Sequence, residues 1–320
     1  MLSVLSITGP IYLVIAVGYL ATRAGLFART EMRTFGKYVI HVALPPLLFN
    51  ALSQRSVAEV VNPVFVAAYA GGSLLAFGAG LFWALKVARK PLAASAIAGM
   101  GMACPNSGFI GFPLVAQVFG PATAGVGLAL AMVVENFVSL PLALAIAGSD
   151  LGERAGEGSR AQRVRSALAQ SGRALLRNPM IHGIVAGFVF SLLGWRLPEP
   201  VAKAVNLLAM SCAALSLVVI GGSLVGIRAR GMLRDVGVIA AGKLLLHPLG
   251  VLLMVVLLPP MDSQLQTAVV LMAAVPMLGI YPILAQPHGQ DAMAAAAQLA
   301  TTVLSFFTLT SLLWLLQATR

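Results

Sequence analysis

The chain has 320 residues, of which 59% are hydrophobic and only 10% are charged, and its mean hydropathy is +0.93. A soluble domain carries about 25% charged residues, so this composition excludes an ordinary soluble protein. The formal net charge of +11 could suggest nucleic-acid binding, but most basic residues flank apolar runs, where they set membrane topology. We therefore expect an all-α integral membrane protein in a lipid bilayer, with no nucleic-acid partner.

Apolar runs of about 20 residues, the length that crosses a bilayer as a helix, recur along the whole chain. We predict a transmembrane helix in each of them. In chain order the predicted spans are Ile7–Phe27, Thr34–Ser53, Val61–Leu85, Pro91–Gly120, Thr123–Gly148, Asn178–Pro198, Val201–Gly226, Asp235–Pro259, Asp262–Gly289 and Asp291–Leu316.

One polar and basic segment, "SDLGERAGEGSRAQRVRSALAQSGRALLR" (149–177), divides the ten spans into five and five. We expect a first five-helix repeat over 1–148, a linker over 149–177 and a second repeat over 178–320. Because five is odd, the second repeat must insert upside down relative to the first. Inverted repeats of this kind are typical of secondary transporters.

The basic residues lie mostly on one side of the membrane if the spans alternate. Sixteen of the 21 fall on the side of the central linker and four on the opposite side. Basic loops stay cytoplasmic, so we expect a cytoplasmic linker and two periplasmic termini.

Spans four and nine each contain helix-breaking residues at mid-membrane. The stretches are "MACPNSGFIGFPLVAQVFG" (Met102–Gly120) and "AAVPMLGIYPILAQPHG" (Ala273–Gly289). Free backbone groups are tolerated in a bilayer only where they line a cavity or are buried in protein, and half-helix N-termini attract anions. We expect two broken helices that cross at a substrate site, whereas the alternative is a simple proline kink packed by small residues. The candidate substrate-binding residues are Pro105, Asn106, Ser107, Gly108, Gly279, Ile280, Tyr281 and Pro282, with Asn50 of span two along the path.

Two charged residues lie deep within spans, Glu135 in span five and Lys243 in span eight. Charges inside a membrane are costly, so each is a candidate for ion or proton coupling. We expect them to pair with each other. The alternatives are that Lys243 extends alone to the cytoplasm and that Glu135 stays a protonated, hydrogen-bonded carboxyl.

The motif "CPNSGFIGFPL" (residues 104–114) resembles the span-four signature of the auxin efflux carrier family. Further stretches resemble that family in order, among them "HVALPPLLFNALS" (His41–Ser53) and "LLRNPMIHGIVAG" (Leu175–Gly187). The resemblance implies two inverted repeats, a scaffold of spans one, two, six and seven, and a mobile core that moves as an elevator. It also implies that Asn106 contacts a substrate carboxylate. Span nine departs from the plant pattern, because Tyr281 is its only polar side chain at the break.

The resemblance and the short loops together imply a secondary carrier of small organic anions in a bacterial inner membrane. Malonate or malate is the first expected substrate and an auxin-like acid the second. The alternatives are a sodium-coupled carrier of the bile-acid symporter type, which shares the fold, and a sensor that transports nothing. We expect no enzyme activity, cofactor or metal site, and the oligomeric state is open, with a homodimer as one candidate.

Overall fold

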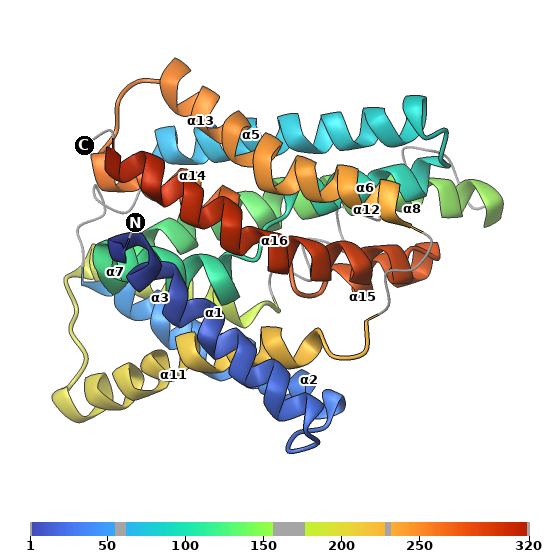
Figure 1. Cartoon of the computed structure of the whole chain (residues 1–320). Coiled ribbons are helices and arrows are strands. Elements are labelled where there is room, and N and C mark those ends of the chain that lie inside the picture. The colour runs from blue at the N-terminus through green and yellow to red at the C-terminus, as the bar shows by residue number, and fades with distance from the viewer. Residues whose placement is uncertain (1, 55–61, 156–176, 228–231, 319–320) are drawn as a thin grey trace.

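The structure is a computed structural model that describes residues 2–54, 62–155, 177–227 and 232–318 (Figure 1). Within these ranges the regular structure is helical, apart from a single bridge between Pro105 and Met277. The predicted all-α class is therefore confirmed. The predicted linker lies largely outside the described residues, in the gap 156–176.

The part of the chain before the linker forms helices whose π-helical segments are labelled η. They are α1 (Leu2–Arg23), α2 (Arg29–Tyr38), η1 (Val39–Ala43), α3 (Leu44–Ser53), α5 (Pro63–Phe82), η2 (Trp83–Val87), α6 (Leu92–Ala103), η3 (Ser107–Gly111), α7 (Phe112–Val134), η4 (Glu135–Ser139) and α8 (Leu140–Ala155).

The part after the linker is built in the same way, with one short 3₁₀ segment, η6. Its elements are α10 (Pro179–Leu193), α11 (Glu199–Ser223), α12 (Leu233–Ala241), η5 (Gly242–Leu246), α13 (His247–Leu257), α14 (Ser263–Ala274), α15 (Tyr281–Ala285), η6 (Gln286–His288) and α16 (Asp291–Ala318).

Among the described residues, seven helical runs are long and apolar enough to cross a membrane, so the chain is a multi-pass membrane protein. Three shorter apolar helices, α6, α10 and α14, lie within predicted spans four, six and nine. The longest run, Ser107–Gly148, turns at Gly120, whose φ of 84° and ψ of 165° are not helical. Pro121 follows at once, so the chain reverses where spans four and five were predicted to separate.

Several helix ends differ from the predicted span ends. The first helix ends at Arg23 rather than Phe27, because Gly25 has a φ of 80° and begins a turn. The second helical run begins at Arg29 rather than Thr34, where the Glu31 side chain accepts a 2.6 Å hydrogen bond from the Ala28 backbone N–H. The fifth helix continues to Ala155, beyond the predicted end at Gly148.

Four of the π-helical segments precede a proline by two residues. The prolines that follow η1, η3, η4 and η5 are Pro45, Pro113, Pro141 and Pro248. Proline cannot donate to the carbonyl four residues earlier, and a π turn lets a neighbouring N–H reach back five residues instead. At η4 the Leu140 N–H bonds the Glu135 carbonyl, and at η5 the His247 N–H bonds the Gly242 carbonyl.

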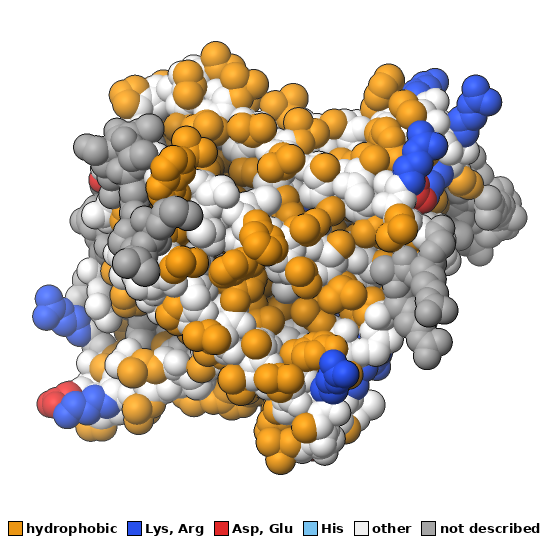
Figure 2. Space-filling view, in the orientation of Figure 1, with side chains coloured by type: hydrophobic (Ala, Val, Ile, Leu, Met, Phe, Trp, Pro, Cys, Tyr) orange, Lys and Arg blue, Asp and Glu red, His pale blue; other side chains and the backbone are white. Residues whose placement is uncertain are grey.

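The helices pack in two groups with α7, α14 and α16 between them (Figure 1). In the first group, α1 packs on α11, and α3 packs on α10 and α11. In the second group, α5 packs on α6 and α13, and α6 packs on α8. Figure 2 shows a wide hydrophobic surface over the middle of one face, with Lys and Arg side chains toward its ends, as a bilayer requires.

Candidate functional site

The centre of the molecule is a place where two helices stop and their following segments pair. Helix α6 ends at Ala103 and Cys104 is extended, with φ −104° and ψ 104°. Helix α14 ends at Ala274, and the Asn106 N–H donates to the Pro276 carbonyl at 2.8 Å. The Leu278 N–H donates to the Cys104 carbonyl at 3.0 Å. Each interruption therefore satisfies backbone groups that the other leaves free.

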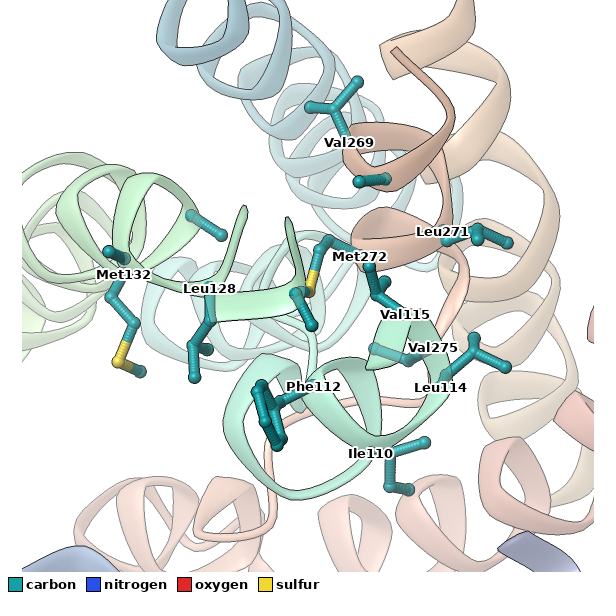
Figure 3. Close-up of a cluster of buried hydrophobic side chains, with 14 of the residues drawn as sticks. Ile110, Phe112, Leu114, Val115, Leu128, Met132, Val269, Leu271, Met272 and Val275 are labelled. Atoms are coloured by element: carbon teal, nitrogen blue, oxygen red, sulfur yellow. The ribbon is translucent and has the colours of Figure 1, made fainter. Parts of the chain in front are cut away.

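Close apolar packing holds this pairing in place (Figure 3). Side chains of η3 and α7 meet side chains of α14 and of the residue after it. The labelled members of the cluster are Ile110, Phe112, Leu114, Val115, Leu128, Met132, Val269, Leu271, Met272 and Val275. A Cβ on Gly111 would lie 2.7 Å from the Met272 sulfur, so glycine permits the approach of η3 to α14.

Asn106 stands at the break as the N-cap of η3. Its side-chain oxygen accepts from the Phe109 N–H at 3.4 Å, and the residue is only 3% exposed. No hydrogen bond joins its amide nitrogen, Nδ2, to a residue that the structure describes, and this nitrogen is not among the fully buried unpaired atoms. The hypothetical Cβ of Gly279 lies 3.5 Å from this nitrogen. An N–H donor is thus available next to the second break.

The Ser107 hydroxyl is hydrogen-bonded to the buried carboxyl group of Glu135. The Glu135 Oε1 accepts from the Tyr69 hydroxyl at 2.7 Å and from the Ser107 hydroxyl, and all three side chains are buried. The hydroxyl oxygens of Tyr69 and Ser107 are also 3.2 Å apart, within hydrogen-bond distance. The carboxyl therefore links α5, η3 and η4, and it fixes the start of the helix that follows the first break.

Lys243 is fully buried and binds the end of the other interrupted helix. Its Nζ donates to the carbonyl oxygen of Ala273, in the last turn of α14, at 2.6 Å. A cation at a helix C-terminus is stabilised by the unpaired carbonyls there. The same Nζ lies 3.0 Å from His247 Nδ1, and His247 Nε2 lies 3.0 Å from the Ser73 hydroxyl.

The expected pairing of Glu135 with Lys243 is not what the structure has. Both residues are described, and no ion pair joins them. Each takes partners at a different break, since Glu135 meets Ser107 and Lys243 meets Ala273. Lys243 does not extend to the cytoplasm either, because it is 0% exposed.

His247 is completely buried beside Lys243. Its position four residues after Lys243 puts both side chains on one helix face, which is the sequence signal that could have revealed the contact. A charged Lys243 needs acceptors, and the unprotonated Nδ1 of a neutral His247 supplies one.

The remaining predicted residues of the breaks differ in what they offer. Tyr281 is buried, and its hydroxyl donates to the Ile97 carbonyl of α6 at 2.9 Å. Gly108 faces Leu44 of α3, whose Cδ1 would lie 3.5 Å from an added Cβ. Pro105 is buried within the bridge, whereas Ile280 is 42% exposed and Pro282 is partly exposed.

Asn50 lies in a separate hollow, a cavity of about 640 Å³ among the ends of α3, α10 and α11. Its other polar lining residues include Gln54 and Arg196, and its aromatic ones include Trp195. None of the residues that pair at the two breaks lines this cavity. The structure therefore does not bring Asn50 together with Asn106.

Sequence reasoning missed Gln298 of α16. This residue is 5% exposed, and its Nε2 donates to the Gly279 carbonyl at 3.1 Å. The sequence of span ten carries no distinct signal for this contact, because the contact depends on how α16 packs against the second break.

Comparisons with known proteins agree with this architecture. A family profile described as "Membrane transport protein" matches residues 4–315. A Rhizobium meliloti protein named "Putative malonate transporter" is 27% identical over 313 residues, which cover 97% of this chain and 94% of that protein. The Escherichia coli K12 protein named "Uncharacterized transporter YfdV" is 22% identical over 308 residues, covering 96% and 95%. An uncharacterized transporter of Methanothermobacter thermautotrophicus is 26% identical over 256 residues, covering 75% and 74%.

Proposed function

Because the chain belongs to the membrane transport protein family, the family of auxin efflux carriers, we propose that it is a secondary carrier of small organic anions. The observation that carries this proposal is the Asn106 side chain, which is 3% exposed at the meeting of two helix breaks and whose Nδ2 bonds no residue that the structure describes. Buried polar groups are normally paired, so an unpaired donor at such a place is suited to an acceptor that comes and goes. A carboxylate is such an acceptor.

We infer that the described helices form ten spans in two inverted repeats, over 1–148 and 178–320, with 149–177 between them. The α6–η3 and α14–α15 segments are the two broken, crossing helices. The packing of α1, α3, α10 and α11 as one group supports a scaffold, and the packing of α5, α6, α8, α12 and α13 as another supports a mobile core. The core would carry the anion across as an elevator.

The buried charges suit a carrier of anions. An anion in a low-dielectric interior is costly unless positive charge lies near it. Lys243 supplies a fixed positive charge at the second break without a bound sodium ion. The name of the Rhizobium meliloti relative supports a dicarboxylate such as malonate as the first substrate to test.

The test is uptake into proteoliposomes that contain the purified protein. The panel is malonate, malate and an aromatic monocarboxylate, each with and without sodium and proton gradients. We expect saturable uptake of at least one carboxylate in sodium-free buffer. A strict requirement for sodium would instead favour a symporter of the bile-acid type, and no uptake of any anion would contradict the proposal.

Glu135 is the proposed proton-binding group of the cycle, and Glu135→Gln tests it. Glutamine keeps an oxygen that accepts from Tyr69 and Ser107, so we expect the variant to fold. It cannot lose or gain a proton, so uptake should lose the pH dependence that the wild type shows. The measurement is the dependence of malonate uptake on pH in the wild type and in the variant. A variant with the wild-type pH profile would rule out this role.

The basic residues also predict the orientation of the protein. A cysteine placed in the 149–177 segment should resist membrane-impermeant thiol reagents in intact cells, because that segment is expected to be cytoplasmic. The same cysteine should react after the cells are opened. The two native cysteines, Cys104 and Cys212, are buried and give a low background. Labelling from outside would reverse every span and contradict the topology.

A further inference from the structure

A small space lies over Gly279 at the second break. A Cβ built on this glycine would lie 3.5 Å from Asn106 Nδ2, 3.8 Å from Ile220 Cδ1 and 3.9 Å from Gln298 Nε2. These distances are ordinary van der Waals contacts, so the space admits an added atom without displacing its neighbours. The three nearest atoms are thus two amide nitrogens and one aliphatic carbon from α11.

The two amides come from different parts of the chain but face the same point. Asn106 and Gln298 are 3% and 5% exposed, so neither is an ordinary surface side chain. Each side-chain NH₂ group carries two N–H donors. Gln298 uses one of them on the Gly279 carbonyl, and Asn106 Nδ2 uses none on a described residue.

We propose that Gln298 is a substrate-binding residue, and that it and Asn106 together hold one carboxylate of the transported anion over Gly279. This inference rests on the proposed function and adds a binding residue that lies on α16, outside both broken helices. Tyr281, the only polar side chain that span nine offers there, is occupied by its bond to α6.

Neutral N–H donors are suited to binding the carboxylate of the transported anion. Lys243 and Glu135 are already engaged with Ala273, Tyr69 and Ser107, so the charged groups do not have to release a partner when the anion enters. A carboxylate has two oxygens, and the N–H donors of two amides can serve one each. Ile220, which belongs to the proposed scaffold, places an apolar carbon 3.8 Å from the same point.

The first test replaces the donor. Gln298→Met keeps a similar length and removes the N–H, and Gln298→Glu replaces the donor with an acceptor that can carry negative charge. We expect malonate binding to the purified protein to fall about tenfold in the first variant and further in the second, because a lost bond to a charged group is worth about that factor. Gln286→Glu makes the same change at an exposed glutamine of η6 and should bind malonate like the wild type.

The second test fills the space. Gly279→Ala places a methyl group between the two amides, and this glycine is not among those with positive φ, so alanine suits its backbone. We expect a normal thermal unfolding midpoint and a loss of malonate binding. The control is Gly127→Ala on α7, where the added Cβ also meets only ordinary contacts, 3.7 Å from Met272 Cε and 3.8 Å from Ala268 Cβ.

The results separate this inference from the function it rests on. If the wild type binds malonate and both Gln298→Met and Gly279→Ala bind it equally well, the inference is overturned while the carrier function stands. If the wild type binds none of the carboxylates in the uptake panel, the proposed function fails and this assignment fails with it. Loss of binding in both variants, with midpoints unchanged, supports the assignment.

Discussion

Replacing Lys243 with alanine is expected to abolish malonate uptake in sodium-free proteoliposomes. Lys243 is the only fully buried lysine or arginine among the described residues, and its ammonium group binds the end of α14 at the second break. Without it, the anion would enter a site whose nearest buried charge is the acid Glu135. Like charges in a low-dielectric interior repel strongly, so uptake should stop or come to depend on an added cation.

The Lys243 experiment needs variants that separate charge from folding. Lys243→Met keeps most of the volume but leaves the Ala273 carbonyl and His247 Nδ1 without a donor, which should lower the free energy of unfolding by about 3 kcal/mol. Lys243→Arg keeps the charge and should retain more uptake than Lys243→Ala. The matched control is Lys203→Ala on α11, an exposed lysine in a surface pair with Glu199. Undiminished uptake by Lys243→Ala would remove this residue from the mechanism.

The second large effect is expected at Asn106. Asn106→Ala should weaken malonate binding by about 1–3 kcal/mol, or roughly 5–150-fold, because a buried polar group of the ligand loses its partner. The bridge between the two breaks should survive, since it uses the Asn106 backbone N–H and not the side chain. Isothermal titration of the purified variant measures the effect.

Asn106→Asp tells recognition apart from helix capping. Aspartate is as good an N-cap as asparagine, so the bond from the Phe109 N–H is retained. The variant replaces Nδ2 with an oxygen that repels a carboxylate, and it should therefore bind malonate more weakly than Asn106→Ala does. If Asn106→Asp binds malonate as tightly as the wild type, the side chain serves the fold and not the substrate.

Much of the helical framework could be predicted from the sequence, because the signals are local. Apolar runs of bilayer length predicted helices, and Gly120 with Pro121 marked the reversal between spans four and five. Pro105 and Pro276 lie next to the ends of α6 and α14, at Ala103 and Ala274. Proline acts on its own chain within one turn, so its effect can be located without knowledge of the fold.

The partners of the buried charges could not be predicted in the same way. The sequence offers Lys243 one oppositely charged side chain inside the membrane, that of Glu135. The structure uses a backbone carbonyl, that of Ala273, which becomes a good acceptor only because α14 ends there. His247 and Gln298 were missed for a related reason, since their roles depend on which helices pack together.

The two buried charged residues lie in π-helical turns that precede prolines. Glu135 and Lys243 both lie in such turns, six and five residues before Pro141 and Pro248. These turns are frequent at functional sites, and in a membrane they keep the backbone bonded before a proline. A charged residue at this distance before a membrane proline is a pattern that could have been recognised from sequence.

The central claim is that the two helix breaks meet at the anion site. The most direct measurement is an experimental structure of the protein with malonate at saturating concentration. The account predicts density for a carboxylate over Gly279, within hydrogen-bond distance of Asn106 Nδ2 and Gln298 Nε2. Malonate bound instead in the cavity lined by Asn50 and Arg196, with none at the breaks, would contradict it.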